Sequence, residues 1–336
     1  MSKHQLLESE AVVELAQHIS VVAFHSASGR RKVKPPRSGC SQIALQVLLV
    51  GHGLRRAALV DALSLSAAQA SAISEALDSL SKQAHDESVA LREVRLLYHA
   101  ATSQTFIVST RDSLWNDIAS LKERSLQQSQ SYPVLWVDAR STPQHNAPTA
   151  TTTDTHTTQL IEAISEAVQR ESPGNALVIF QPDQARIDTE EFQLVGVALA
   201  GLLLEYGAVY CLHKVSPSQD VEEYHNDVRP LKFKGEPTEE ASFSASPTNC
   251  LGSQPLMLYR VTWSHHTDKM ELLAFSVPER LSSEGGVEHL HEALTETFRS
   301  RLTRIDSVKS SAFARELSSG SISVDLTTVT LPQVAL

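Results

Sequence analysis

A nearly continuous apolar pattern between residues 176 and 214 predicts a strand, a helix and a second strand. Ala176–Phe180 is a short apolar run without alternation, as expected of a strand that is covered on both faces. From Phe192 to Tyr206 almost every position is apolar or small, which predicts a helix buried on all sides. Val209–Leu212 is the next apolar run. Two strands joined in this way by a helix usually form a parallel pair, so the stretch predicts one crossover unit of an α/β fold.

The limits of this helix are also marked in the sequence. Asp188, with Glu191 three residues later, is typical of a helix start. Gly207 is expected to end the helix in a left-handed conformation. The apolar part, at about 15 residues, is shorter than the roughly 20 needed to cross a bilayer, so no membrane segment is predicted.

Hydrophobic periodicity predicts further elements on both sides of this unit. Helices are expected over residues 8–24, 41–52, 66–82, 112–125, 159–170 and 287–302, and strands over residues 56–63 and 133–137. Two pairs of alternating segments, 92–98 with 105–109 and 256–263 with 270–277, predict antiparallel hairpins. Together they predict an α/β three-layer sandwich, with central parallel strands near residues 58, 135, 178 and 210 and the antiparallel hairpins at the edges.

The distribution of polar segments predicts a single α/β domain over residues 1–303. Three stretches near residues 26–39, 141–157 and 215–248 are rich in Pro, Ser, Thr or charge and have little to bury, so they are expected to be flexible insertions. Residues 304–336 form a C-terminal tail whose end has strand-like composition, and the sequence leaves its packing open.

Charge and cysteine usage narrow the function classes. The formal net charge of -10 over 336 residues argues against a nucleic-acid partner, which usually requires a basic surface. The three cysteines have no paired spacing, so neither a disulfide framework nor a structural zinc site is predicted. The N-terminus lacks the apolar core of a signal peptide, which favours a cytoplasmic location. The basic residues between 30 and 37 are interpreted as a nuclear localisation signal, a contact for an anionic partner, or a solvated loop.

Three stretches carry a family resemblance: PVLWVDAR at 133–140, FQLVGVALAGLLLEYGAVYCLHK at 192–214, and NCLGSQPLMLYRV with LLAFSVPERL between 249 and 281. They resemble an uncharacterised eukaryotic family, the one typified by the human chromosome-one open reading frame seventy-four protein. The resemblance covers roughly residues 41–302. It implies no known activity, cofactor or site, and it is consistent with the predicted fold and cytoplasmic location.

Candidate chemistry lies where the predicted parallel strands end, because ligands of open α/β sheets bind at the carboxyl ends of their strands. Asp61, Asp138, Asp183 and His213 follow the four predicted strands. If these side chains converged, they could bind Mg²⁺ or Mn²⁺, or act as general acid and base. The alternative is structural, because Asp after a strand commonly forms a turn or caps a helix.

Standard catalytic motifs are missing from the sequence. The glycines at 51 and 53 precede a strand instead of opening a helix, so they predict a helix end and not a phosphate loop. No nucleophile elbow is present. The sequence therefore favours a cytoplasmic, non-catalytic binding or scaffold protein with an unknown protein partner and no cofactor. The alternative is a metal-dependent hydrolase or phosphotransferase that uses Asp61, Asp138 and Asp183.

Overall fold

The computed structural model describes residues 5–25, 37–83, 86–99, 102–111, 134–139, 147–151, 177–180, 189–211, 250–284, 287–308 and 311–332. The helices in these ranges are α1 (Glu10–His25), α2 (Arg37–Gly51), α3 (Ala67–Ser81), α4 (Ser88–Arg92), α7 (Thr189–Leu203), α8 (Leu290–Val308) and α9 (Ala312–Ser318), with short 3-10 turns η1 (Gln5–Glu8), η2 (Glu279–Leu281) and η3 (Val287–His289). The strands are β1 (Ala57–Leu59), β2 (Val94–His99), β3 (Gln104–Ser109), β4 (Leu135–Asp138), β5 (Thr149–Thr151), β6 (Leu177–Phe180), β7 (Ala208–Cys211), β8 (Pro255–His265), β9 (Asp268–Pro278) and β10 (Ser321–Thr330). This mixture of helices and small sheets fits the predicted α/β class.

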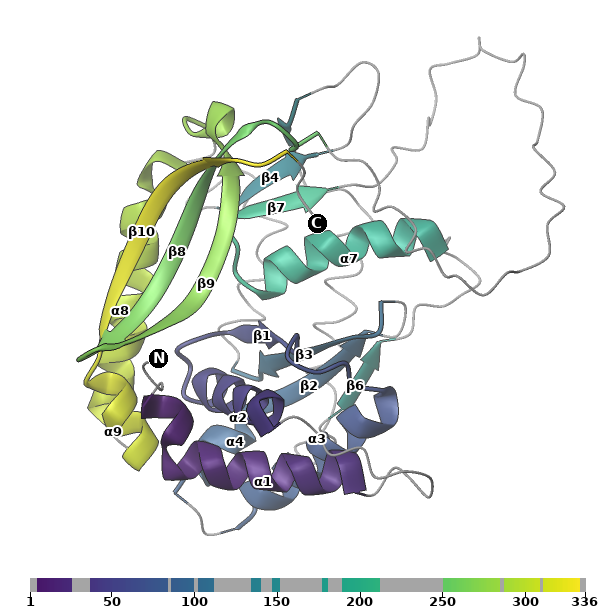
Figure 1. Cartoon of the computed structure of the whole chain (residues 1–336), viewed down its shortest axis with the longest axis vertical. Helices are drawn as coiled ribbons and strands as arrows, with labels where there is room; N and C mark the ends of the chain where they lie inside the picture. The colour runs from purple at the N-terminus through teal and green to yellow at the C-terminus, as the bar shows by residue number, and fades with distance from the viewer. Residues whose placement is uncertain are drawn as a thin grey trace, which may run out of the picture.

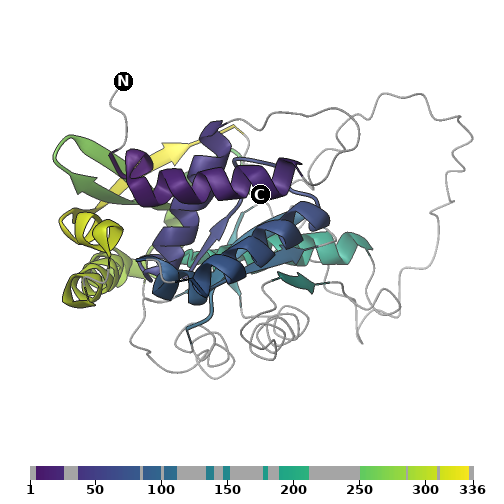
Figure 2. The ribbon, with the colours of Figure 1, turned by 90° about the horizontal axis from the view of Figure 1, so that it is seen from below.

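The first sheet has the strand order β1-β3-β2-β6. Its centre is the predicted hairpin of β2 and β3, which is confirmed, and β6 pairs with β2 in parallel. Helices α2 and α3 pack on one side of this sheet, and α7 lies on the other side (Figure 1). Seen from below, the purple and blue helices cover the sheet, while the yellow helices α8 and α9 stand at one end (Figure 2).

Two smaller sheets complete the described structure. One has the order β5-β4-β7, in which β4 and β7 are parallel. The other has the order β10-β8-β9 and contains the second predicted hairpin, β8 and β9, which is confirmed. The end of the predicted tail does pack, because β10 pairs with β8 along its whole length. Helix α8 continues to Val308 and packs on β10 (Figure 1).

The predicted crossover unit is wrong in one respect. Both strands and the helix between them form, but β6 belongs to the first sheet and β7 to the sheet of β4. The four strands near residues 58, 135, 178 and 210 are therefore divided between two sheets, and the β2–β3 hairpin occupies the centre of one of them. The pairing rule holds for strands of one sheet, and a local apolar pattern does not tell which sheet a strand joins.

Helix ends follow local chemistry at most of the predicted positions. Ser66 caps α3 and forms the predicted capping box with Gln69. Gly53 follows α2 with a φ of 78°, so the predicted helix end is confirmed. Helix α2 begins at Arg37, earlier than expected and inside the stretch assigned to an insertion. The predicted helices over 112–125 and 159–170 lie outside the described residues, as do most of the three expected insertions.

The end of α7 differs from the prediction. Glu205, not Gly207, adopts the left-handed conformation, with a φ of 64°. The Tyr206 N–H donates to the Gly201 carbonyl at 2.8 Å, and the Glu205 N–H donates to the Leu202 carbonyl at 3.1 Å. This pair of hydrogen bonds is the Schellman motif, which commonly ends a helix at a left-handed residue. Gly207 has a different role, because a Cβ there would lie 2.7 Å from the side chain of Leu290.

The core is continuous from α2 to the sheet of β8, β9 and β10. Helix α2 is buried at four consecutive positions, Val47 to Val50, so it is enclosed on all sides at that level. In the C-terminal sheet the rings of Tyr259 and Phe275 stack at 5.4 Å. The Trp263 Nε1–H donates to the Leu317 carbonyl at 2.9 Å and ties α9 to β8. Within the described ranges, every helix is too short or too polar to span a bilayer.

Candidate functional site

Two of the four predicted site residues, Asp61 and Asp138, are described, and they follow or end strands of different sheets. Asp61 follows β1 and lines a depression of about 270 Å³ with Lys269 and Glu271. Asp138 is the last residue of β4, in a different sheet. Asp183 and His213 lie outside the described residues. Because β1 and β6 form opposite edges of the first sheet and β4 belongs to another, these strands do not end along one edge of a single sheet, as the prediction assumed.

The surroundings of these two carboxylates differ. Asp61 is exposed, with the amides of Gln42 and Gln46 in the same depression. Asp138 is half-buried and lies close enough to Cys250 to affect its thiol. Burial raises the pKa of that thiol, and the Asp138 charge adds to the increase. In the part of the chain that the structure describes, no three His, Cys, Asp or Glu side chains group in a way that could hold a metal ion.

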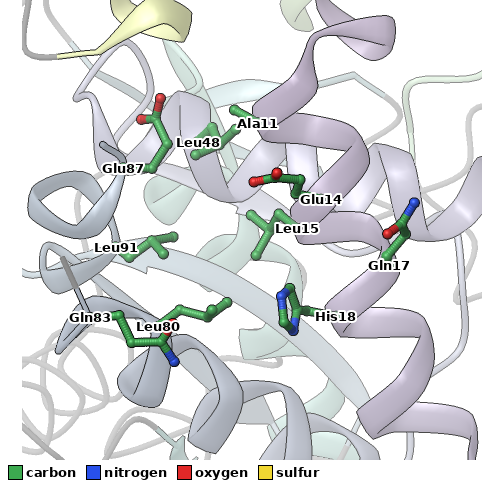
Figure 3. A pocket seen from close by; sticks show the side chains of 10 residues that line it. All are labelled: Ala11, Glu14, Leu15, Gln17, His18, Leu48, Leu80, Gln83, Glu87 and Leu91. Carbon is green, nitrogen blue, oxygen red and sulfur yellow. The ribbon is translucent and has the colours of Figure 1, made fainter. Parts of the chain in front are cut away.

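A pocket of about 280 Å³ lies between α1 on one side and the ends of α3 and α4 on the other (Figure 3). Its apolar lining consists of Ala11, Leu15, Leu48, Leu80 and Leu91, and its polar lining consists of Glu14, Gln17, His18, Gln83 and Glu87. The leucines come from four helices, α1, α2, α3 and α4, and Figure 3 shows those of α1, α3 and α4 pointing toward one another. Apolar walls with a few polar groups are typical of binding pockets in proteins.

The polar wall of the pocket connects to the residue after α2. The Glu87 Oε2 atom lies 2.7 Å from the Nε2 atom of His52, and both side chains are at most 6% exposed. A buried carboxylate is unfavourable unless it accepts hydrogen bonds, and the imidazole supplies one. The His52 ring also stacks on Phe313 of α9 at 5.5 Å. This contact places Glu87 in a fixed position at the pocket wall.

The outer surface of α1 beside the pocket is partly apolar. Val13 and Val21 are 40% and 56% exposed. They stand four residues on either side of Gln17, so the three side chains form one stripe of the helix. Glu14 and His18 are exposed beside this stripe. The pocket therefore opens beside a surface that carries exposed valines and a carboxylate.

A buried ion cluster joins three distant parts of the chain at the end of α7. The Arg301 guanidinium donates from both of its terminal nitrogens to the Glu205 carboxylate, with Nη1 2.9 Å from Oε2. The Arg56 backbone N–H donates to the same Oε2 at 3.1 Å, and its Nε lies 3.3 Å from Oε1. Burial alone would raise the pKa of the Glu205 carboxyl, but Arg301 and Arg56 hold it below its ordinary value. A left-handed conformation is unfavourable for a non-glycine residue, and these bonds offset that cost.

Sequence reasoning missed the residues of both features. The residues around His52 predict only a helix end, and Glu87 lies in a polar stretch without periodicity. Glu205 offered one local signal, because it is the first acidic residue after a long apolar helix. The partner of Glu205 is 96 residues away at Arg301, and no local pattern indicates that pairing.

Comparison with known proteins defines the class. Residues 25–336 match the model of a family described as a domain of unknown function, DUF4504. The chain belongs to this family, and the predicted membership of an uncharacterised family is confirmed at that level. Neither a curated protein nor a solved structure matches the chain.

Proposed function

We propose that the protein is a non-catalytic binding protein and that the pocket between α1 and α3–α4 receives a side chain of a protein partner. The observation that carries this proposal is the pocket itself, which combines leucine walls with the carboxylates of Glu14 and Glu87 (Figure 3). The same helix α1 also carries the exposed Val13 and Val21, and apolar surface next to a pocket suits a peptide or protein surface better than a small metabolite.

The chemistry of the pocket selects the kind of partner. A Lys or Arg side chain has an apolar stem and a cationic end, so its stem would contact Leu15 and Leu80 while its charge approached Glu14. Aliphatic residues beside that side chain would cover Val13 and Val21. The net charge of -10 favours encounter with a basic segment. The expected partner therefore presents a basic residue flanked by aliphatic ones.

Selection from a phage-displayed library of short peptides tests this function. Enriched peptides are expected to contain Lys or Arg next to Val, Leu or Ile, and a synthetic copy should bind the full chain in fluorescence anisotropy. Glu14→Arg should weaken that binding by at least about tenfold, because it places a like charge at the pocket. The matched control is Glu296→Arg on α8, which makes the same charge change at another exposed position and should leave the affinity unchanged. Peptides without a basic residue, or equal losses in both variants, would contradict the proposal.

The metal-dependent hydrolase or phosphotransferase is the alternative, and the separation of Asp61 from Asp138 in different sheets lends it no support. Thermal unfolding with and without Mg²⁺, Mn²⁺ or Zn²⁺ distinguishes the two functions. A rise of several degrees that Asp61→Asn or Asp138→Asn abolishes would favour the metal-dependent enzyme, because a ligand that binds only the folded state stabilises it.

Three further attributes belong to the same proposal. We place residues 1–303 and the C-terminal segment in one domain, because the continuous core includes Phe313, Leu317 and Ile322. Of the three expected insertions, the described parts belong to α2 and β5, and the rest lies outside the described residues. We expect a cytoplasmic location or, through the basic segment 30–37, a nuclear one. We also propose that the human chromosome-one open reading frame seventy-four protein is a relative, on the residues that carry the resemblance.

A further inference from the structure

Arginine side chains from distant segments converge on the C-terminal end of α2. The Arg111 Nη2 atom donates to the Gly51 carbonyl at 2.9 Å, and Arg301 Nη1 donates to the Leu54 carbonyl at 3.2 Å. The last carbonyls of a helix carry partial negative charge and attract cations, which explains why these guanidiniums gather there. The only carboxylate within 4 Å of Arg111 in the described residues is Glu93, 3.9 Å from its Nε, and both side chains are about one-third exposed. This exposed ion pair is weak.

A third guanidinium increases the positive charge at this point. The Arg304 Nη2 atom lies 3.5 Å from the carbonyl of Gly53. Burial lowers the pKa of Arg304, and the neighbouring charges of Arg111, Arg301 and Arg56 lower it further. All three of those neighbours are cations, so the Arg304 guanidinium stands in a positive field although the whole chain is acidic.

A small pocket of about 60 Å³ is lined by two of these arginines, Arg111 and Arg304, together with apolar residues. The rest of its lining consists of Val89, Ala90, Ile305, Val308 and Ala314, with Gly51 and His52. A space of this size holds a group of only a few heavy atoms. The pocket is therefore small, and its lining combines two cationic side chains with apolar ones.

We propose that this pocket binds a carboxylate attached to a short aliphatic group. The planar guanidiniums of Arg111 and Arg304 would donate hydrogen bonds to the two carboxylate oxygens, a pairing that guanidinium geometry favours. The aliphatic group would contact Val89, Ile305 and Val308. Val89 is 56% exposed and Val308 is 65% exposed, so a bound aliphatic group would remove apolar surface from water. A tetrahedral phosphate would leave the apolar lining uncovered.

Two sources supply this chemistry, a free short-chain acid and the C-terminal residue of a peptide. Isothermal titration calorimetry of the full chain with sodium isovalerate tests the shared chemistry. Binding is expected, and Arg304→Gln should weaken it roughly ten- to hundredfold, the usual contribution of a charge-assisted hydrogen bond. The matched control is Arg299→Gln, which removes one positive charge at an exposed position of the same helix. This variant should bind isovalerate as the wild type does.

A second variant tests the site without removing an arginine. Val308→Glu supplies a competing carboxylate at the pocket from an exposed position, so folding should persist while isovalerate binding is lost. N-acetyl-Gly-Leu and its C-terminal amide then separate the two sources. If N-acetyl-Gly-Leu binds more tightly than isovalerate and its amide does not bind, the ligand is a peptide C-terminus. If isovalerate binds and N-acetyl-Gly-Leu does not, the ligand is a free acid. No binding of either carboxylate, tighter binding of inorganic phosphate, or equal losses in Arg304→Gln and Arg299→Gln would overturn the proposal.

Discussion

We expect the buried imidazole of His99 to make the folded protein sensitive to moderate acid. The residue ends β2 and is 1% exposed, and its Nδ1 atom lies 2.6 Å from the Thr102 hydroxyl. Helix α7 covers it closely, since a Cβ on Gly196 would lie 4.0 Å from the imidazole. Burial lowers the pKa of His99 from 6.5 to about 4, because the cationic form would lose its hydration.

The sign and size of the effect follow from proton binding. As the pH falls through about 6.5 the unfolded chain binds a proton at this position, while the folded chain does not until about pH 4. The unfolded state is therefore favoured progressively over that interval. The difference between 6.5 and about 4 corresponds to about 3 kcal/mol of unfolding free energy lost by pH 4.

Urea unfolding at several pH values between 7.5 and 4 measures this loss. His99→Gln removes the titrating group, so its unfolding free energy should fall by about 3 kcal/mol less than that of the wild type over the same interval. Thr102→Val serves as the control, because it removes the hydrogen-bond partner and keeps the imidazole buried, and the pH dependence should persist. If His99→Gln and the wild type lose stability in parallel, burial of His99 does not set the acid sensitivity.

Three further substitutions test the buried interactions by urea or thermal unfolding. Arg301→Leu should lower the free energy of unfolding by about 3–5 kcal/mol, because it leaves the Glu205 carboxylate buried without its main partner. Adding Glu205→Leu should recover much of this loss, and equal stability of the single and double variants would contradict this account. Gly320→Ala should cost about 3 kcal/mol, since its Cβ would lie 2.1 Å from the indole nitrogen of Trp263, and an unchanged melting temperature would show that the chain moves aside freely. Leu203→Asp should cost about 4 kcal/mol or more, because Leu203 is 1% exposed in α7 and an unpaired charge would be buried; a stable variant would refute the enclosed position of this helix.

Local pattern predicted the elements of this fold well and their partners poorly. The hairpins and the capping box at Ser66 depend on residues a few positions apart, which the sequence displays directly. The assignment of β6 and β7 to different sheets depends on packing between segments far apart in the chain. The same limit applies to the sites. Asp61 could be found as a strand-end residue, whereas the pocket beside Glu14 exists only because α1 packs against α3.

The ion cluster at the end of α7 has a consequence for how the chain is made. Its three members lie far apart in the sequence. Glu205 is 149 residues from Arg56 and 96 residues from Arg301. On the ribosome, Glu205 emerges long before Arg301, so a nascent chain that ends within α7 can gather the apolar surface around this carboxylate but cannot neutralise it fully. We therefore expect the last steps of assembly to require α8. A stalled or truncated product would then retain an incompletely closed core, the kind of surface that chaperones bind and proteases remove.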